Sequence, residues 1–373
     1  MCDSGDFREG ASVTRTVPIA EAVGLVLAHD VTEIRKGEFK GRAFKKGHIV
    51  RHDDIHRLQQ IGKEHLYVLT ISADEMHEDD AALTLARALT GDGVAMQEEP
   101  KEGKVKLVAA RDGLLTIDRD ALLQFNLLGD VICSTLHNNT VVKKDRVIAE
   151  TKAVPLVVKR TVISQAVSIA GSGIVTVKEI RKPKAGVVIT GNEVYHGRIQ
   201  DRFAPVIAKK IEAFGGEIIG TYLAPDDRDI IQQRLRELLD AGADLLITTG
   251  GMSVDPDDVT RFAIRDLGAT ELTYGSPVLP GAMFMVGYLE KADSSEFGVR
   301  SENSKHLTQN SGPIPILGIP ACGMYHKTTV LDLVLPRVLA GERIGRRELA
   351  ELGHGGLCLH CTSCQYPVCP FGK

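Results

Sequence analysis

The sequence predicts an α/β protein with a doubly wound, mostly parallel sheet in its second half and β-rich α+β parts before it. From residue 183 onward, short apolar runs alternate with amphipathic segments of helical length, as in a sheet with helices on both faces. Residues 71–182 instead carry short β-rich pieces around two helical segments. These changes of pattern predict four parts: 13–70, 71–182, 183–345 and a cysteine-rich tail at 346–373.

The elements of the N-terminal parts are predicted from helical spacing and from glycines that end a run. Ile55, Leu58 and Ile61 recur at helical spacing, and Gly62 ends this helix. A second helix is expected after the acidic residues 78–80. The other expected elements are strands at 26–31, 65–69, 104–108, 114–117, 131–135 and 146–149, and a short helix at 120–127.

The second half alternates strands and helices. A buried strand at 186–190 leads to a helix that Asp201 caps, and Asp227 caps the next helix. The other expected elements are strands at 217–223, 245–249, 271–274, 283–287 and 314–319, and helices at 259–264 and 324–339. In sheets of this kind, ligands bind beyond the carboxyl ends of the strands.

The composition excludes several classes of protein. Of the 373 residues, 43% are hydrophobic and 25% are charged, and the net charge is −4, which favours neither a nucleic-acid nor a membrane partner. No run approaches the roughly 18 apolar residues of a membrane span. The first residues are polar and acidic, unlike a signal peptide, so a cytoplasmic location is expected.

The most informative segment is 248–258, which follows a buried apolar run and precedes a predicted helix. Its paired glycines, Gly250 and Gly251, allow backbone N–H groups to approach an anionic ligand closely. Three carboxylates follow on the opening turn of the helix: Asp255, Asp257 and Asp258. They can hold a metal ion, while the same turn is also typical of a helix N-terminus. The two roles coexist because one carboxylate suffices for a cap.

Other loops are expected at the same edge of the sheet. Small or acidic residues follow three further strands, at 190–193, 224–227 and 319–323, and Pro280-Gly281 precedes another strand. Asp227 is expected to be a plain N-cap, whereas Glu193 has no helix to cap and is expected to contact a ligand. The lone Cys322 is expected to be a small packing residue rather than a nucleophile.

Residues 184–345 resemble the molybdopterin-binding domain of molybdenum-cofactor biosynthesis enzymes, above all the molybdopterin molybdenumtransferase family. Thr190–Val194 resembles its Thr-Gly-Asp-Glu-Leu element, Thr249–Val254 its Gly-Gly-Val-Ser-Val turn, and Leu279–Gly281 its Lys-Pro-Gly, in the same order and spacing. Pro225–Asp227 also recurs in the family. Residues 13–70 resemble part of its N-terminal region and form a transferase-like N-terminal unit.

The resemblance implies molybdopterin as ligand or substrate, in its adenylylated form, together with molybdate and Mg²⁺. It also implies a homodimer and allows a molybdoenzyme as partner. The implied catalytic residues, which hold Mg²⁺ or position molybdate, are Glu193, Asp255, Asp257 and Asp258. The implied cofactor-binding residues are Thr190, Gly191, Asn192, Thr249, Gly250, Gly251, Met252, Ser253, Pro280, Gly281, Pro320, Ala321, Cys322 and Gly323.

The chain also departs from the transferase pattern. Where the family carries Asp-Gly-Tyr-Ala-Val, this sequence has Ile34–Arg42, without the aspartate and the tyrosine. Asp255–Arg261 is closer to the Pro-Asp-Asp-Leu-Thr-Arg run of the competence-damage-inducible protein family. Three functions therefore stay open: insertion of molybdate into molybdopterin, non-catalytic carriage or delivery of the molybdenum cofactor, and nucleotide pyrophosphatase activity.

The tail carries four closely spaced cysteines. Cys358, Cys361, Cys364 and Cys369 follow the spacing C-x2-C-x2-C-x4-C and precede a proline. This spacing is one residue longer than the bacterial ferredoxin run, and four thiolates also suit structural zinc. The tail is therefore expected to bind an iron–sulfur cluster or Zn²⁺, with His354 and His360 as substitute ligands, and the alternative is a disordered tail with free thiols.

Overall fold

The computed structural model describes residues 14–35, 39–69, 71–97, 99–252, 258–290 and 312–373. The described residues divide into two compact units. The first unit is drawn from Met1–Arg111, Thr116–Leu136 and Lys143–Val177, and the second from Asp112–Leu115, His137–Val142 and Lys178–Lys373. Within the described ranges, no helix is long and apolar enough to cross a membrane.

Residues 14–69 of the first unit have a small core of their own. Leu58 of the helix lies against Leu27 and Val68 of the sheet, and all three are fully buried. The elements are α1 (Asp54–Gln60), the antiparallel sheet β1 (Thr14–Pro18), β5 (His65–Leu69) and β2 (Val26–Leu27), and the hairpin β3 (Val31–Arg35) and β4 (Phe39–Phe44). The segment 34–42, which replaces the transferase motif, lies on this hairpin, and residues 36–38 of it fall outside the described residues.

The remainder of the first unit is β-rich, as expected. Its four-stranded antiparallel sheet is β10 (Val131–Thr135), β12 (Val147–Ala153), β8 (Lys104–Ala109) and β7 (Val94–Met96). The helices are α2 (Glu78–Leu89), α3 (Arg119–Asn126) and α4 (Arg160–Ala170), and β13 (Val157–Lys159) pairs with β6 (Glu75–His77). A further three-stranded sheet consists of β11 (Val141–Val142), β9 (Gly113–Ile117) and β14 (Val175–Lys178).

The second unit is built on one six-stranded sheet. Its strands, in spatial order, are β16 (Glu217–Ala224), β15 (Lys184–Thr190), β17 (Leu245–Thr249), β20 (Ile314–Ile319), β19 (Met285–Leu289) and β18 (Thr270–Tyr274). The first four strands are parallel to one another, and β19 and β18 join them antiparallel. The predicted doubly wound, mostly parallel α/β sheet is therefore confirmed.

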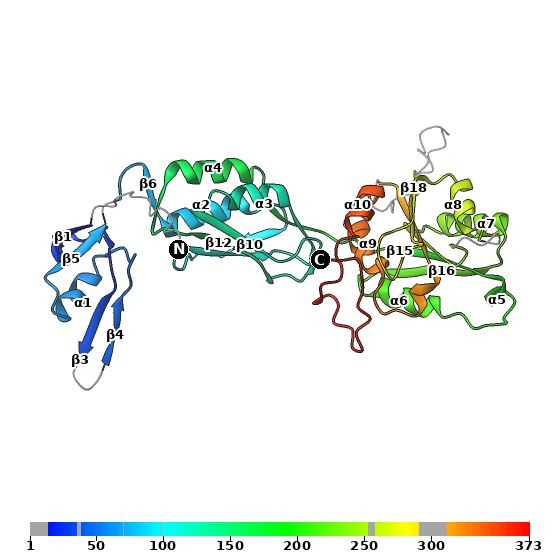
Figure 1. Ribbon diagram of the computed structural model, residues 1–373, viewed down its shortest axis with the longest axis horizontal. Coiled ribbons are helices and arrows are strands. Elements are labelled where there is room, and N and C mark those ends of the chain that lie inside the picture. The colour runs from blue at the N-terminus through cyan, green and yellow to red at the C-terminus, as the bar shows by residue number, and fades with distance from the viewer. Residues whose placement is uncertain (1–13, 36–38, 70, 98, 253–257, 291–311) are drawn as a thin grey trace, which may run out of the picture. The chain divides into compact units, whose positions relative to one another are not determined.

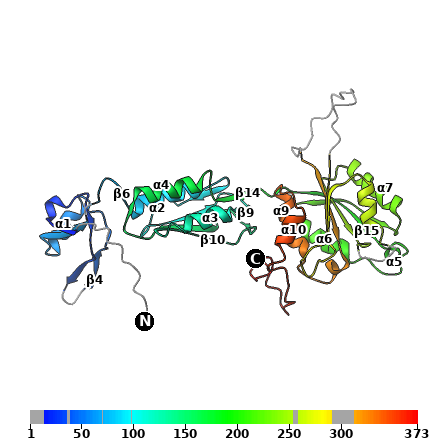
Figure 2. The same ribbon diagram turned by 45° about the horizontal axis from the view of Figure 1, so that its top comes forward.

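Helices cover both faces of this sheet because successive side chains of a strand point to opposite faces. Val187 and Ile189 of β15 pack with α6 (Phe203–Glu212) and α9 (Val330–Leu339), whereas Val188 packs with α7 (Arg228–Asp240) and α8 (Thr260–Asp266). Figures 1 and 2 show α6 and α9 on one side of β15 and α7 on the other. Both faces of the central strands are buried, which explains their continuous apolar sequence.

The predicted caps of the second unit are present. The Asp201 carboxylate accepts hydrogen bonds from the backbone N–H groups of Phe203 and Ala204 at 2.8 and 3.0 Å. The Asp227 carboxylate accepts two from the first turn of α7, both at 3.0 Å. Asp227 is thus the plain N-cap that the sequence predicts.

The prediction of one helix over 324–339 is wrong at its start. The α-helix begins only at Val330, and a short 3-10 helix, η2 (Ala321–Met324), lies before it. Thr329 sets this boundary with a capping box. Its hydroxyl accepts a hydrogen bond from the Leu331 N–H, and the Thr329 N–H donates to the Asp332 carboxylate at 2.7 Å.

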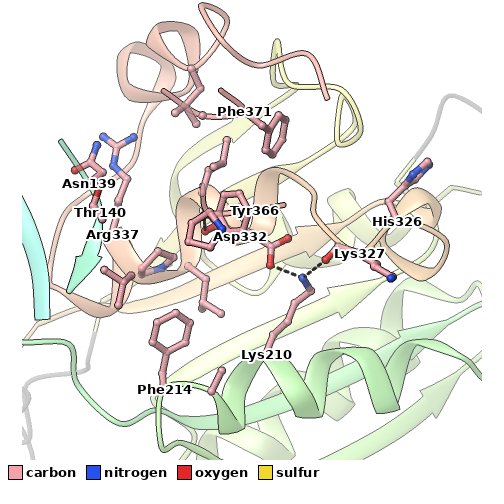
Figure 3. A pocket seen from close by; sticks show the side chains of 18 of the residues that line it. Asn139, Thr140, Lys210, Phe214, His326, Lys327, Asp332, Arg337, Tyr366 and Phe371 are labelled. Atoms are coloured by element: carbon pink, nitrogen blue, oxygen red, sulfur yellow. Dashed lines mark hydrogen bonds and ion pairs between the residues drawn. The ribbon is translucent and has the colours of Figure 1, made fainter. Parts of the chain in front are cut away.

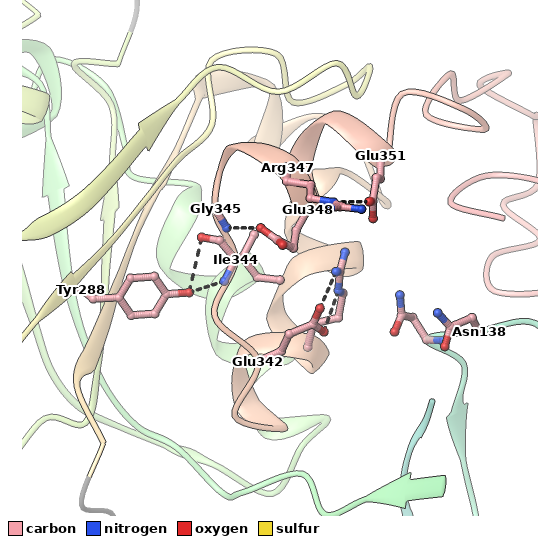
Figure 4. Close-up of polar contacts among 10 residues, drawn as sticks. Asn138, Tyr288, Glu342, Ile344, Gly345, Arg347, Glu348 and Glu351 are labelled. Carbon is pink, nitrogen blue, oxygen red and sulfur yellow. Dashed lines mark hydrogen bonds and ion pairs between the residues drawn. The ribbon is translucent and has the colours of Figure 1, made fainter. Parts of the chain in front are cut away.

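The connection from α9 to α10 (Arg346–Glu351) is fixed by polar contacts (Figure 4). The Tyr288 hydroxyl, at the end of β19, accepts a hydrogen bond from the Ile344 N–H at 2.6 Å. Burial raises the pKa of this phenol, so Tyr288 stays neutral in this role. Glu348 accepts from the Gly345 N–H at 2.8 Å and closes the first turn of α10.

Candidate functional site

The order of the strands puts a topological switch point between β15 and β17, the place where open α/β sheets commonly bind ligands in a crevice. The chain leaves β15 through α6 on one face to reach β16, and then returns through α7 on the other face to β17. The connections therefore run in opposite directions from β15, which makes the carboxyl ends of β15 and β17 a topological switch point. Thr190 and Thr249 are the last residues of these two strands.

Three buried threonines join the two strand ends to α8. The Thr190 hydroxyl donates a hydrogen bond to the backbone oxygen of Thr249 at 2.8 Å and lies 3.0 Å from the Thr260 hydroxyl. All three side chains are almost fully buried. The buried Thr249 hydroxyl has no hydrogen-bond partner among the described residues. Thr260, the first residue of α8, was not predicted as a site residue, because only the fold brings it beside Thr190.

We expect Thr190→Val to lower the free energy of unfolding by about 1 to 2 kcal/mol, because the isosteric side chain cannot donate to the Thr249 oxygen. Thr221→Val is the matched control, since Thr221 lies exposed on the neighbouring strand β16. Urea denaturation of both variants measures the difference. Equal losses in the two variants would mean that the Thr190 bond does not stabilise the strand ends.

The two glycines that follow β17 have backbone angles that other residues rarely adopt. Gly250 has φ +81° and Gly251 has φ +55°. A Cβ atom on Gly250 would lie 2.3 Å from the Thr190 backbone oxygen, and one on Gly251 would lie 2.3 Å from the Thr260 hydroxyl. Glycine is therefore required at both positions by backbone angle and by space. The turn brings its backbone directly against the end of β15.

The loop after β15 is held by the loop after β16. The Asn192 N–H donates to the Asp226 carboxylate at 3.0 Å, and the Asp226 N–H donates to the Asn192 side-chain oxygen at 3.3 Å. No role of its own was predicted for Asp226, because its carboxylate acts across loops rather than along the chain. Gly191 is buried with φ +141°, and a Cβ there would lie 3.0 Å from the Glu193 carboxylate.

Glu193 itself is exposed in the first turn of α5 (Asn192–Tyr195), so the prediction that no helix begins beside it was wrong. Its carboxylate makes no hydrogen bond or ion pair with any other residue that the structure describes. It therefore stands beside the crevice with its charge uncompensated by the surrounding protein.

Two further predicted segments lie at the same edge of the sheet. β19 is antiparallel to β20, so the residues before Met285 lie beside the end of β20. Pro280 accepts a hydrogen bond from the N–H of Val330 at 3.2 Å, and a Cβ on Gly281 would lie 2.5 Å from the Val330 side chain. Pro320 and the η2 residues Ala321, Cys322 and Gly323 follow β20 directly. Burial raises the pKa of the Cys322 thiol, which keeps it protonated and suits a packing residue.

The acidic half of the opening motif is described only in part. Ser253, Asp255 and Asp257 lie outside the described residues. Met252 is buried, and its backbone oxygen accepts a hydrogen bond from the Tyr274 hydroxyl. Asp258 is half-buried. Beyond it, the Arg261 guanidinium lies over the rings of Phe262 and Tyr274, at 4.8 and 5.4 Å from their centroids.

A cavity lies beside α6 and α9 (Figure 3), and Met324 of η2 is among the residues that line it. Lys210 of α6 points across it to the Asp332 carboxylate and to the backbone oxygen of Lys327. Arg337, also on α9, is paired with Glu342. Because the half-buried Lys210 and the buried Arg337 already have anionic partners, the cavity is a poorer anion site than the glycine turn.

The tail packs on the α/β unit. Phe371 is buried among the residues of α9, and Cys358, Tyr366 and Cys369 pack against the same core. Cys358, Cys361, Cys364 and Cys369 all line one cavity under the tail. As the described side chains stand, no three His, Cys, Asp or Glu residues lie close enough together to hold a metal ion.

Family models match two parts of the chain. Residues 186–340 match a family model described as "Probable molybdopterin binding domain", and residues 16–70 match a "Domain of unknown function (DUF8806)". A CinA-like protein of Mycobacterium avium (strain 104) is 39% identical over 89 residues, 22% of this chain and 20% of that protein. A CinA-like protein of Mycolicibacterium gilvum (strain PYR-GCK) is 40% identical over 89 residues, 22% of this chain and 21% of that protein. The chain thus matches about a fifth of the length of these relatives.

Solved structures of three proteins are also similar. CinA of Thermoplasma acidophilum, titled a protein of unknown function, has a TM-score of 0.32 and 15% identity, over 42% of this chain and 98% of that chain. The tungsten cofactor synthesizing protein MoaB of Pyrococcus furiosus has a TM-score of 0.30 and 17% identity, over 44% and 99%. A molybdenum cofactor biosynthesis protein of Pyrococcus furiosus has a TM-score of 0.24 and 14% identity, over 90% and 67%. These TM-scores are too low to support an argument about function. The family match supports the assignment: residues 186–340 match the model of a probable molybdopterin binding domain.

Proposed function

We propose that this protein binds adenylylated molybdopterin at the crevice between β15 and β17 and inserts molybdate into it. The observation that carries the proposal is the glycine turn at the topological switch point. Gly250 and Gly251 are half-buried and form the tight turn after β17, which lies directly against Thr190 and Thr260. Exposed backbone N–H groups bind phosphate without needing a lysine.

The residues around the turn fit the two halves of such a substrate. The phosphates would lie against Gly250-Gly251, and the apolar and small residues at Pro280-Gly281 and 320–323 would face the pterin. The Asn192–Asp226 pair would keep the loop after β15 in place while the substrate binds. A homodimer and delivery to a molybdoenzyme partner are part of the same proposal.

Glu193 suits a role in holding Mg²⁺. Magnesium in phosphate-processing sites takes one or two carboxylates and completes its shell with water and substrate phosphates. Glu193 offers such a carboxylate with no competing protein partner among the described residues, and Asp258 lies on the next strand-end loop. Bound there, Mg²⁺ would screen the negative charge of the phosphoanhydride as AMP leaves. Asp255 and Asp257 are proposed as further ligands on the sequence motif alone.

Glu193→Gln is expected to lower the rate of molybdate insertion at least about tenfold, the equivalent of 1.4 kcal/mol, because the amide cannot neutralise Mg²⁺. Molybdopterin affinity should change by less than about threefold, since the glycine turn is intact. Glu217→Gln is the matched control: Glu217 is exposed at the opposite edge of the same sheet. Anaerobic single-turnover assays with adenylylated molybdopterin, molybdate and Mg²⁺ measure the insertion rate separately from the molybdopterin affinity. Equal rates of molybdate insertion in the two variants would mean that Glu193 does not hold the metal ion.

The same assay on the unaltered protein decides between the candidate functions. Metal-loaded cofactor with release of AMP supports insertion. Tight binding without turnover would instead indicate a carrier of the finished cofactor. Hydrolysis of ordinary dinucleotides without use of molybdate would indicate a pyrophosphatase, the function suggested by the likeness of Asp255–Arg261 to the competence-damage-inducible family. A metal at the four C-terminal cysteines is a separate proposal, because it involves different residues.

A further inference from the structure

The cavity beside α6 and α9 has the size of a small-molecule site. Its volume is about 580 Å³ (Figure 3). Sites for small organic ligands commonly have volumes of about 300 to 1,000 Å³, with mostly apolar walls and a few well-placed polar groups. Residues of α6, of α9, of the loop between η2 and α9, and of the tail all contribute to the lining. The fold therefore builds this space from segments that lie far apart in the sequence.

Aromatic side chains form part of its apolar wall. Phe214 follows α6 directly, and Tyr366 and Phe371 come from the tail (Figure 3). Phe371 is only 3% exposed, and the Tyr366 hydroxyl donates to the backbone oxygen of Asp332 at 3.2 Å, so both tail rings are held in place. Aromatic rings pack favourably against one another in offset or edge-to-face arrangements. This wall therefore favours a ligand that carries an aromatic ring.

The polar part of the wall contains two cations with partners. Arg337 is 5% exposed and uses Nε and one Nη for the Glu342 carboxylate. Its other Nη donates to no residue that the structure describes. Lys210 is 15% exposed and is paired with Asp332. Both groups can donate a further hydrogen bond into the cavity, but the charge of each is balanced by a carboxylate of the protein.

Two further lysines at the cavity lack such a balance. Lys209 of α6 and Lys327 of the loop before α9 are exposed, and both line the cavity. Neither ammonium group forms an ion pair or a hydrogen bond with another residue that the structure describes. In the described lining, Asp332 is the single acidic side chain, and Lys210 already pairs with it. The lining therefore has an excess of positive charge, which attracts an anionic group.

We propose that this cavity binds a small aromatic anion. Its ring would lie against Phe214 and Tyr366, and its carboxylate or phosphate would lie near Lys209 and Lys327. The unpaired Nη of Arg337 supplies a donor for a polar substituent of the ring. An aromatic wall, a buried donor and an excess of positive charge all favour this class of ligand over a neutral or a cationic one.

The bound anion would lie against the loop that follows β20. Met324, the last residue of η2, and Lys327 both line the cavity, and Pro320–Gly323 precede them on the same connection. Binding in the cavity does not require the proposed molybdopterin chemistry, because it is measured on the full chain without any pterin. A failure of one proposal therefore leaves the other standing.

The probe for this site is anilinonaphthalene sulfonate, an aromatic anion whose fluorescence rises in apolar surroundings. We expect saturable binding of about one probe molecule per chain. Naphthoate and naphthyl phosphate carry the same ring with a carboxylate or a phosphate, and at least one of them should displace the probe. The more effective competitor identifies the anionic group that the cavity prefers. Absence of saturable binding, or failure of both competitors, would overturn the proposal.

Charge variants test the role of the two lysines. Lys209→Gln and Lys327→Gln should each weaken binding of the anionic probe about threefold, and together about tenfold. Binding of N-phenylnaphthylamine, the same ring system without the sulfonate, should stay within about twofold. Arg236→Gln is the matched control, because Arg236 is exposed on α7, on the other face of the sheet. Equal affinities for the anionic probe in the lysine variants and this control would contradict the proposal.

A space-filling variant tests the place of binding. Val206 is half-buried on α6 and lines the cavity, so Val206→Trp should weaken binding of both probes at least about tenfold. Gln233→Trp adds the same indole at an exposed position of α7 and should leave both affinities unchanged. Circular dichroism checks that both variants fold. A folded Val206→Trp variant that binds both probes like the unaltered protein would show that they bind elsewhere.

Discussion

Gly250→Ala is expected to lower the free energy of unfolding by about 2 to 5 kcal/mol and to abolish ligand binding at the crevice. Two effects add at this position. A φ of +81° costs an alanine about 1 to 2 kcal/mol. The new Cβ would also lie 2.3 Å from the Thr190 backbone oxygen, so the ends of β15 and β17 must separate. That separation would break the Thr190–Thr249 hydrogen bond and reshape the phosphate site.

Gly242→Ala is the matched control for this prediction. Gly242 follows α7 with φ +94°, but nothing lies within 4 Å of the Cβ that alanine would add. It should therefore show the backbone strain alone, about 1 to 2 kcal/mol, and leave binding intact. Urea denaturation and titration with molybdopterin measure both effects. If the two variants lose the same stability and both still bind, the close approach of the turn to β15 is not what requires glycine.

Glu342→Ala is expected to lower the free energy of unfolding by about 2 to 4 kcal/mol. Arg337 is only 5% exposed, and its guanidinium donates two hydrogen bonds to the Glu342 carboxylate, at 2.9 and 2.6 Å. Removal of the carboxylate leaves a buried cation without its counter-charge, which is costly in a medium of low dielectric constant. The loss should stay below that of a fully buried pair because the Glu342 side chain is 25% exposed and water can reach the vacated space.

The second ion pair in Figure 4 provides the control. Arg347 and Glu351 lie 3.1 Å apart on α10, with side chains that are 85% and 62% exposed. Glu351→Ala should change the stability by less than about 0.5 kcal/mol, because water screens this pair. Thermal melts of both variants at low and at moderate salt make the comparison. A larger loss from Glu351→Ala than from Glu342→Ala would contradict the role given to burial.

Much of the second unit follows from local sequence. The central strands are continuous apolar runs because both of their faces are buried. Asp201 and Asp227 predict the starts of helices because an N-cap side chain bonds to the first turn of its own helix. The start of α9 was predicted too early. Residues 324–329 have no local feature that excludes a helix, and only the capping box of Thr329 and Asp332 fixes the boundary.

The candidate site could be predicted in outline and not in its contacts. Paired glycines and small residues after strands indicate the edge, because parallel strands end together. The Thr190–Thr260 contact and the Asn192–Asp226 pair join residues far apart in sequence, and neither residue type carries a signal of its partner. The antiparallel direction of β19, which brings Pro280-Gly281 to the edge, likewise depends on pairing with β20 rather than on its own residues.

One contact beneath the glycine turn couples two distant positions. Met252 is buried, and a Cβ on Gly318 of β20 would lie 2.4 Å from its terminal methyl carbon. The Met252 side chain thus occupies the space that a side chain at position 318 would need. In a library with both codons randomised and selected for folding, survivors with a larger residue at 318 should carry a smaller one at 252. Such a pattern would show that the packing beneath the glycine turn depends on the neighbouring strand β20.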